Sequence, residues 1–234
     1  MRRKFLVVSS WAIAAAMQVL VLNGPVFGAN TSRPAQSAKQ NAPVILVLGD
    51  SLSAEYGLQR GQGWVALLAD RVHQSGSNYT VANASISGET TSGGRTRLPT
   101  LLKQHRPAIV IIELGGNDGL RGLPVSRMQD NLAAMVRASL AAGARVIVAG
   151  MRIPPNYGRE YTERFYAAFG AVAEQYNTAL VPFLLEGFSD TGDFFQSDRI
   201  HPSAQAQAKI SQTVWPVLQS VLTNRIKPAV ATKQ

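Results

Sequence analysis

Ser51 stands directly after an apolar run, residues 44–48, and the short link Gly49-Asp50. The β-branched composition of that run predicts a strand buried on both faces of a parallel sheet. Ligands of open α/β sheets bind beyond the carboxyl ends of the strands, so Ser51 is delivered to the place where chemistry usually occurs. The residue is therefore a candidate nucleophile, although an isolated Gly-Asp-Ser more often holds a serine that caps the next helix.

His201, near the other end of the chain in the sequence Asp198-Arg-Ile-His201, is a candidate base for this hydroxyl. A serine hydroxyl becomes a good nucleophile only when a base takes its proton, and that base needs an acceptor on its other ring nitrogen to fix its tautomer. Three residues of one turn can bring a carboxylate beside an imidazole, so Asp198 can orient His201 and His201 can face Ser51. A lone Asp-x-x-His would otherwise be interpreted as a surface pair or as half of a metal site.

Two further predicted strands also end in small and polar residues. They are followed by Ser85-Ile-Ser-Gly88 and by Gly115-Gly-Asn117-Asp118. The carboxyl ends of parallel strands lie on one rim of the sheet, and glycines there let backbone N–H groups approach a ligand closely. A glycine N–H and an asparagine amide beside a serine hydroxyl are the components of an oxyanion hole. Taken singly, Gly88 fits a turn glycine and Asn117 fits an Asx-turn.

No pattern in the sequence calls for a metal or a cofactor, and we predict none. The chain has no cysteine, which excludes a thiolate nucleophile, a disulfide framework and a Cys-ligated metal. It has no His-Glu-x-x-His motif and no cluster of histidines or carboxylates. His73 falls within a predicted helix and His105 at the end of another, where the helix dipole stabilises a cation, so both are interpreted as structural.

Strands and helices alternate strictly along the chain. Apolar runs predict strands at residues 44–48, 79–83, 108–114, 145–150 and 178–183, the last at a sheet edge because it contains Pro182. Helical spacing of apolar residues predicts helices at residues 64–74, 91–105, 126–142, 161–176 and 203–222. This alternation predicts an α/β fold, a three-layer α/β/α sandwich with a five-stranded parallel sheet.

The N-terminal residues 1–29 are interpreted as a secretory signal peptide. A basic start at residues 2–4 precedes an apolar stretch at residues 5–22, and small residues follow it. Cleavage after Gly28 is expected, which would release a periplasmic or secreted protein without a stable membrane span. An uncleaved N-terminal anchor is the alternative.

Residues 30–43 are predicted to form a flexible linker, because they are rich in Thr, Ser, Gln, Ala and Pro and lack an apolar period. The folded domain is predicted at residues 44–223, followed by a frayed tail at 224–234. The formal net charge of +9 falls to +6 without residues 2–4, which leaves 20 basic against 14 acidic residues, and these are scattered. Such a pattern favours solubility, and we expect no nucleic-acid partner.

Taken together, these motifs resemble the four sequence blocks of the SGNH (GDSL) hydrolase family, which are named for Ser, Gly, Asn and His. The blocks correspond to Gly49-Asp-Ser51-Leu-Ser53, Ala84-Ser-Ile-Ser-Gly88-Glu-Thr90, Gly115-Gly-Asn117-Asp118 and Asp198-Arg-Ile-His201-Pro202. The resemblance covers residues 44–222 and implies a flavodoxin-like SGNH-hydrolase fold. Within the family, the chain is most similar to the periplasmic acyl-CoA thioesterase I, lysophospholipase and arylesterase type.

The resemblance implies a role for each motif residue. Ser51 would be the nucleophile, His201 the general base and acid, and Asp198 the partner that orients the imidazole. The oxyanion hole would consist of the backbone N–H groups of Ser51 and Gly88 and the side-chain amide of Asn117.

The resemblance also implies a binding wall for the acyl chain. Ile153 and Pro154 match substrate-binding positions, residues 119–124 match a mobile switch loop over the acyl site, and Asp50 would help to fix the nucleophile loop. The chain departs from this type at Arg199, where glycine is often found. The added bulk and charge beside the base bear on substrate preference.

These expectations describe a serine hydrolase that cleaves carboxylic esters and thioesters through an acyl-enzyme. Its partners would be small-molecule substrates, namely acyl-CoA thioesters, lysophospholipids and aryl esters, and we expect a monomer. A carbohydrate or peptidoglycan O-acetylesterase of the same fold is an alternative, as is transfer of the acyl group to an alcohol other than water. A non-catalytic flavodoxin-like binding module is the alternative from another class, but nothing in it requires Asp198 three residues before His201.

Overall fold

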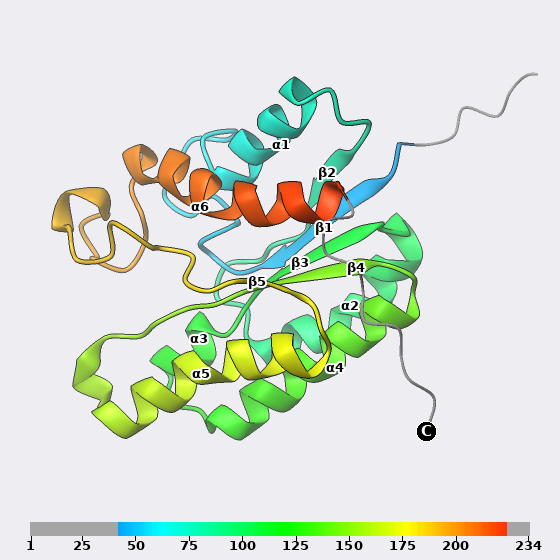
Figure 1. Cartoon of the computed structure of the whole chain (residues 1–234). Helices are drawn as coiled ribbons and strands as arrows, with labels where there is room; N and C mark the ends of the chain where they lie inside the picture. The colour runs from blue at the N-terminus through cyan, green and yellow to red at the C-terminus, as the bar shows by residue number, and fades with distance from the viewer. Residues whose placement is uncertain (1–41, 224–234) are drawn as a thin grey trace, which may run out of the picture. The chain divides into compact units, whose positions relative to one another are not determined.

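Five parallel strands form one sheet in the computed structural model of the chain, which describes residues 42–223 (Figure 1). The strands are β1 (Val44–Gly49), β2 (Thr80–Asn83), β3 (Ile109–Glu113), β4 (Arg145–Ala149) and β5 (Ala179–Val181). Their order across the sheet is β2-β1-β3-β4-β5, and every neighbouring pair is parallel. The predicted five-stranded parallel sheet is thereby confirmed, with β5 at an edge as Pro182 indicated.

Helices cover both faces of the sheet and complete the predicted three-layer α/β/α sandwich. One face carries α1 (Trp64–Gln74) and α6 (Ala204–Leu222), and the other carries α2 (Thr91–His105), α4 (Val125–Ala141) and α5 (Arg159–Gln175) (Figure 1). Among the described residues, no helix is long and apolar enough to cross a membrane. The predicted signal peptide, nearly all of the predicted linker and the predicted tail lie outside residues 42–223.

Apolar side chains fill both faces of the central strands because helices cover both faces. Residues 45–48 of β1 and 109–112 of β3 have no exposed surface. Their Val, Ile and Leu composition is what a parallel strand covered on both sides requires. Glu113 ends the apolar run of β3 and is itself only 2% exposed. A buried carboxyl group therefore lies at the carboxyl end of the sheet.

Most predicted elements match the structure to within one or two residues at each end, and two points differ in kind. β5 is shorter than the predicted strand at residues 178–183, because Pro182 has no N–H to donate to a neighbouring strand. A short helix, α3 (Gly116–Leu120), follows β3 and was not predicted. Its five residues make little more than one turn, too few for an apolar period to reveal a helix.

The carboxyl ends of β2, β1 and β3 lie side by side. β1 is central among the three, and its Gly49 pairs with Glu113 of β3. The segments that follow these strands carry Ser51 after β1, Gly88 after β2 and Asn117 after β3. The topology thus brings the candidate nucleophile and both other candidate oxyanion residues to one rim, as the sequence predicted.

Gly150 marks a close approach between the end of β4 and the segment after β5. A Cβ atom on Gly150 would lie 2.2 Å from the backbone oxygen of Pro182. The N–H and C=O groups of Gly150 already bond Val181 and Leu184. We expect Gly150→Ala to lower the free energy of unfolding by about 1–3 kcal/mol, because a bonded backbone cannot move aside as a side chain can.

Urea unfolding followed by circular dichroism measures this change. Gly192→Ala is the matched control, since a Cβ atom at Gly192 would meet nothing within 4 Å. The control should change the free energy of unfolding by less than about 0.5 kcal/mol. Equal unfolding midpoints for the two variants would contradict the predicted clash.

Candidate active site

Ser51 begins a tight turn at the carboxyl end of β1. The carbonyl of Asp50 accepts hydrogen bonds from the N–H groups of Ser53 (3.2 Å) and Ala54 (2.9 Å). The Asp50 side chain accepts the N–H of Leu52 at 3.0 Å. These bonds fix the backbone on both sides of Ser51, which lines a cavity of the domain.

A buried carboxyl group supports this turn. Ser53 Oγ donates to Glu113 Oε2 at 2.6 Å, and the N–H of Asp50 donates to the same oxygen at 3.3 Å. A Cβ atom on Gly49 would lie 2.7 Å from both Glu113 Oε2 and Ser53 Oγ, so glycine is the residue that fits here. The role of Glu113 was not predicted. The signal that could have indicated it is a single acid at the end of an apolar strand.

His201 lies on the loop before α6 and faces Ser51. Its Nε2 atom is 2.9 Å from Ser51 Oγ, and its Nδ1 atom is 2.6 Å from Asp198 Oδ2. Asp198 Oδ1 also accepts the backbone N–H groups of Ile200 (2.9 Å) and His201 (3.0 Å). The three side chains predicted to be catalytic therefore lie in one hydrogen-bonded chain, with the imidazole held at both nitrogens.

Asp198 remains ionised at neutral pH. Desolvation raises its pKa, but hydrogen bonds from the N–H groups of His201 and Ile200 and from the imidazole outweigh that effect and lower the pKa to about 2. An ionised carboxylate beside Nδ1 favours the tautomer in which Nδ1 carries the proton. Nε2 is then free to accept a proton from Ser51.

The three predicted oxyanion donors differ in whether they already donate a hydrogen bond to the protein. Within residues 42–223, the N–H groups of Ser51 and Gly88 donate to no protein acceptor. Asn117 Nδ2 donates to Asp50 Oδ2 at 3.1 Å and to the carbonyl of Glu89 at 3.0 Å. Asn117 can therefore bind an oxyanion only by sharing or giving up one of these bonds.

Asp50 and Glu113 form a pair of buried acids behind the nucleophile. Burial raises the pKa of Asp50 to about 6, against the opposing hydrogen bonds from Leu52 and Asn117. Complete burial and the negative charge of Asp50 raise the pKa of Glu113 well above its ordinary value. Glu113 consequently keeps its proton at a pH at which Asp198 has lost its own.

Asp118 joins two helices and does not line the cavity. Its side chain accepts hydrogen bonds from the N–H (2.8 Å) and the hydroxyl (2.5 Å) of Thr91, the first residue of α2. This pairing fixes α3, and with it Asn117, against the start of α2. In the part of the chain that the structure describes, no group of three or more His, Cys, Asp or Glu side chains is arranged to hold a metal ion.

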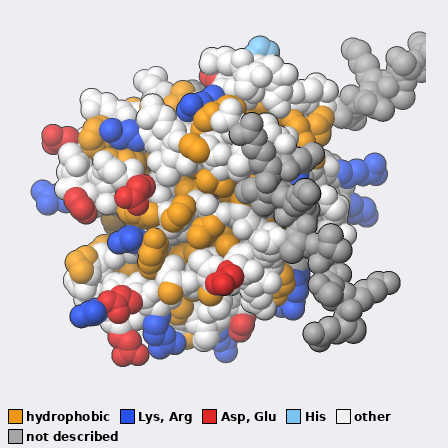
Figure 2. Space-filling model, in the orientation of Figure 1, with side chains coloured by type: hydrophobic (Ala, Val, Ile, Leu, Met, Phe, Trp, Pro, Cys, Tyr) orange, Lys and Arg blue, Asp and Glu red, His pale blue; other side chains and the backbone are white. Residues whose placement is uncertain are grey.

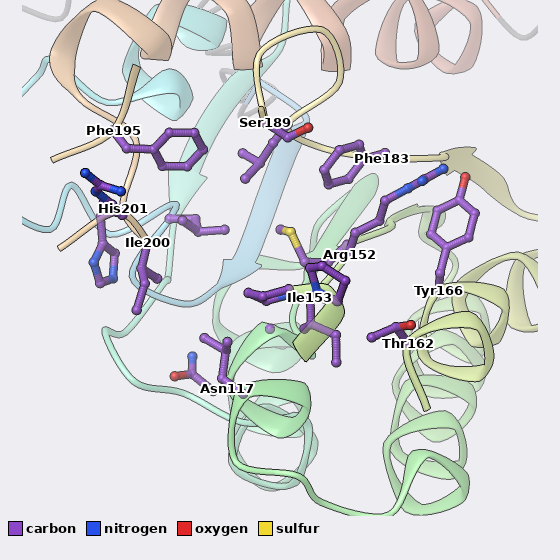
Figure 3. Close-up of a pocket in the computed structure, with 18 of the residues that line it drawn as sticks. Asn117, Arg152, Ile153, Thr162, Tyr166, Phe183, Ser189, Phe195, Ile200 and His201 are labelled. Carbon is purple, nitrogen blue, oxygen red and sulfur yellow. The ribbon is translucent and has the colours of Figure 1, made fainter. Parts of the chain in front are cut away.

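A cavity of about 830 Å³ opens beside Ser51 and His201. Figure 3 shows His201 at one end of it, with Asn117 below in this view and Tyr166 toward the opposite side. Hydrophobic side chains also gather across the face between α5 and α6 (Figure 2). The aliphatic, proline and phenylalanine side chains that line the cavity are Leu52, Leu120, Met151, Ile153, Pro154, Pro155, Phe183, Leu185, Phe195 and Ile200. Both predicted substrate-binding residues, Ile153 and Pro154, are among them.

The predicted switch loop, residues 119–124, begins inside α3. Hydrogen bonds from side chains of neighbouring segments to its carbonyls, and from its own Arg121 to a neighbouring carbonyl, hold it in place. The bonds run from Tyr157 Oη to the carbonyl of Leu120 (2.8 Å), from Tyr161 Oη to the carbonyl of Leu123 (2.7 Å) and from Arg121 to the carbonyl of Gly88 (3.0 Å). The loop therefore connects α5, and the 3₁₀ helix η1 (Pro155–Tyr157) before it, with the glycine predicted to bind the oxyanion.

Arg199 lines the cavity beside the base, where the resembling type often has glycine. Its φ angle is +57°, in the left-handed region that favours glycine. The turn thus keeps the backbone conformation of a glycine while it carries a charged side chain. The sequence shows that arginine stands where glycine is often found. It did not predict that Arg199 would keep the left-handed backbone conformation.

Comparison with known proteins identifies the class. Residues 47–209 match the GDSL-like lipase/acylhydrolase family. Esterase TesA of Pseudomonas aeruginosa strain PAO1 is 51% identical over 181 residues, which cover 77% of this chain and 90% of that protein. Thioesterase 1/protease 1/lysophospholipase L1 of Escherichia coli K12 is 40% identical over 183 residues, which cover 78% of this chain and 86% of that protein.

A solved structure gives the same result. The psychrotrophic esterase EstA from Pseudoalteromonas sp., in a crystal structure inhibited by monoethylphosphonate, has a TM-score of 0.74 and 44% identity, and the match covers 77% of this chain and 99% of that chain. Fold and sequence together define a serine hydrolase that cleaves ester bonds in small molecules. The chain belongs to the GDSL-like lipase/acylhydrolase family, which confirms the resemblance drawn from the four sequence blocks.

Asp50 makes the stability of the fold depend on pH. Its pKa rises from an ordinary 3.8 to about 6 in the folded protein, so folding favours the protonated form. This stabilisation is complete below about pH 4 and is lost as the pH rises through 6. We expect Asp50 alone to lower the free energy of unfolding by about 3 kcal/mol across this window, because one pKa unit corresponds to ~1.4 kcal/mol.

Urea unfolding between pH 4 and pH 7 measures this slope, and Asp50→Asn should lose the share of it that comes from Asp50. Asp70→Asn, at an exposed position of α1, is the control that should keep the wild-type slope. Glu113, whose pKa is also raised, contributes with the same sign in both variants. Asp198 acts outside the window, because its lowered pKa removes stability only as the pH falls from about 4 toward 2. An unchanged slope in Asp50→Asn would exclude Asp50 as its source.

Proposed function

We propose that the chain hydrolyses carboxylic esters and thioesters through an acyl-enzyme on Ser51. One observation carries the proposal: Ser51 Oγ lies 2.9 Å from Nε2 of His201, whose other ring nitrogen lies 2.6 Å from the Asp198 carboxylate. A nucleophile, a base and an acceptor that orients the base are the three groups that activate a serine hydroxyl.

The reaction has two halves that use the same imidazole. His201 Nε2 takes the proton of Ser51 Oγ as the oxygen attacks the carbonyl carbon, and it returns the proton to the leaving alcohol or thiol. A water molecule then attacks the acyl-enzyme, with His201 taking its proton, and the carboxylic acid leaves as Ser51 regains its hydrogen. Asp198 stays ionised throughout and stabilises the imidazolium, because its pKa is only about 2.

When Ser51 attacks, the carbonyl oxygen of the substrate becomes negatively charged, and it faces the three proposed oxyanion donors. The N–H groups of Ser51 and Gly88 have no protein acceptor within residues 42–223 and can bind the charge directly. Asn117 contributes by exchanging its bond to Asp50 or to the carbonyl of Glu89 for one to the oxyanion. Fixed donors aimed at a developing charge are usually a large part of the rate enhancement.

The substrates are acyl-CoA thioesters, lysophospholipids and aryl esters. The cavity of about 830 Å³ lies within the usual size range of ligand pockets, and Ile153 and Pro154 form part of its apolar wall. A pocket that binds an acyl chain by apolar contact discriminates one methylene by only ~1–3 kcal/mol. Such a cavity accepts acyl groups of several lengths. The position of the carbonyl carbon beside Ser51 is then the stricter requirement for a substrate.

The place of action is outside the cytoplasm, with the enzyme as an exported monomer that keeps no stable membrane span. The proposal is based on the signal-peptide pattern of residues 1–29, with its basic start and its apolar stretch. N-terminal sequencing of the mature protein should give Ala29 as the first residue. A mature protein that retains Met1 would indicate an N-terminal anchor.

Ser51→Ala should reduce the hydrolysis of p-nitrophenyl esters to the uncatalysed background, because no other group in the proposed mechanism attacks the carbonyl. Steady-state assays measure the rate, and circular dichroism shows whether the fold survives. A fluorophosphonate probe should label the wild-type enzyme and leave Ser51→Ala unlabelled. Near wild-type turnover in the folded variant would remove Ser51 from its role.

Asn117→Ala should lower kcat by roughly 10²–10³, the usual effect of removing one oxyanion donor, with a smaller change in KM. Steady-state kinetics on p-nitrophenyl butyrate measure both constants. Asn78→Ala, an exposed asparagine between α1 and β2, is the matched control and should behave as the wild type. An equal kcat in both variants would show that Asn117 binds no developing charge.

A hydrolysis panel distinguishes this proposal from carbohydrate or peptidoglycan O-acetyl ester cleavage. The panel compares acetylated xylose with acetyl, decanoyl and palmitoyl thioesters at equal concentration. We expect the decanoyl thioester to be cleaved faster than the acetylated sugar, because the cavity wall offers apolar contact along the acyl chain. A preference for the acetylated sugar would favour the O-acetylesterase alternative.

A further inference from the structure

Tyr56 lies against the imidazole of the predicted base. The ring centroids of Tyr56 and His201 are 4.3 Å apart, and the ring planes are inclined by 37°. Half of Tyr56 is exposed, while the side chain of His201 is only 17% exposed. Tyr56 therefore packs on the imidazole and shields it from water, although it belongs to none of the four sequence blocks.

The hydrogen bonds of His201 fix the ring only at its edge. Asp198 holds Nδ1 and Ser51 faces Nε2, so both contacts lie in the ring plane. Neither contact resists a tilt of the plane about the line that joins the two nitrogens. A ring packed on one face of the imidazole does resist that tilt, and the Tyr56 ring is in position to do so.

The backbone of Tyr56 is tied to the loop that carries His201. Gln196 Nε2 donates to the carbonyl of Tyr56 at 2.8 Å and to the carbonyl of Pro202 at 3.2 Å. The backbone N–H of Gln196 donates to the carbonyl of His201 at 2.8 Å. One glutamine thus connects the segment after the nucleophile with both sides of the base. A Cβ atom on Gly57 would lie 2.0 Å from Gln196 Oε1, so this close approach needs glycine.

The turn that presents Tyr56 has a support of its own. Glu55 has a φ angle of +60°, and its carboxylate accepts the N–H groups of Gly61 (2.9 Å) and Gly63 (2.9 Å). A non-glycine residue adopts this conformation only where its surroundings compensate for the strain. The carboxylate closes the loop between the nucleophile turn and α1, which places the Tyr56 ring beside the imidazole.

We propose that Tyr56 is a positioning residue for His201, held by Gln196, that keeps the imidazole in the plane of proton transfer and stabilises the imidazolium formed in both halves of the reaction. The inference rests on the proposed function, because it presumes that His201 is the base for Ser51. An aromatic face within about 6 Å of a cation stabilises that cation, and small displacements of a reacting group cost large factors in rate.

The test compares Tyr56→Ala and Tyr56→Phe with the wild type. Tyr56→Ala should lower kcat on p-nitrophenyl acetate by roughly 10- to 100-fold and leave KM within about twofold. Tyr56→Phe retains the ring and should restore kcat to within about threefold of the wild type. Gln196→Ala should lower kcat by a smaller factor in the same way. Leu140→Ala removes another exposed large apolar side chain, on α4, and should leave both constants unchanged.

The rate of labelling by a small fluorophosphonate separates positioning from substrate contact. If Tyr56 positions the base, labelling of Tyr56→Ala should slow about as much as its kcat, because phosphonylation also needs the base. A rise in KM with unchanged labelling would overturn the proposal and make Tyr56 a substrate contact. A lowered thermal midpoint with unchanged kcat below that midpoint would also overturn it, because the ring would then act only on stability.

Ser51→Ala, assayed in parallel, keeps the two proposals distinct. If Ser51→Ala is inactive and Tyr56→Ala has wild-type kcat and labelling rate, only the role of Tyr56 fails. If Ser51→Ala retains wild-type turnover, the proposed function itself fails, whatever Tyr56→Ala does.

Discussion

A single hydrogen bond, between Ser51 Oγ and His201 Nε2 at 2.9 Å, joins the first strand of the fold to the loop before its last helix. Close to this bond, α1 packs against α6. The buried side chain of Gln207 on α6 accepts the N–H of Trp64, the first residue of α1, at 3.0 Å. The same side chain donates to the carbonyl of Pro202, next to the base, at 3.2 Å. A shift of α6 along the sheet would therefore carry the base away from the nucleophile.

Three carboxyl groups around the nucleophile have different charge states because their surroundings differ. Asp198 accepts several N–H groups at the edge of the fold, and its pKa falls to about 2. Asp50 and Glu113 are buried behind Ser51, and burial raises the pKa of each. The charge of Asp198 lies beside the His201 ring, whereas Glu113 accepts hydrogen bonds without a full negative charge. On one side of Ser51 a charged carboxylate contacts the His201 ring. On the other side a carboxyl group that keeps its proton holds the turn through hydrogen bonds.

Local pattern was enough to predict the strands, the main helices and the meeting of Ser51, Asp198 and His201. Strict alternation of strands and helices determines a parallel sheet, and a parallel sheet brings the polar ends of its strands together. The contacts of Glu113 with Ser53 and of Tyr56 with His201 could not be predicted, because each joins residues distant in sequence. Ser53 is 60 residues from Glu113, and no period or spacing in the chain indicates that contact. Helix α3 escaped prediction for a different reason, since five residues are too few to show a helical period.

The hydrogen bonds that hold the Ser51 turn are buried, whereas those that hold the loop beside the cavity are partly or fully exposed to water. The Ser51 turn depends on buried bonds to Glu113, whereas the loop at residues 119–124 depends on tyrosine hydroxyls that are partly or fully exposed. Water competes for an exposed hydrogen bond and does not reach a buried one, so the loop opens at a lower free-energy cost than the turn. Under the proposed function, the cavity wall can adapt to acyl groups of different length while the distance between Ser51 and His201 is preserved. The loop beside the cavity and the turn that carries Ser51 are therefore held separately on one rim.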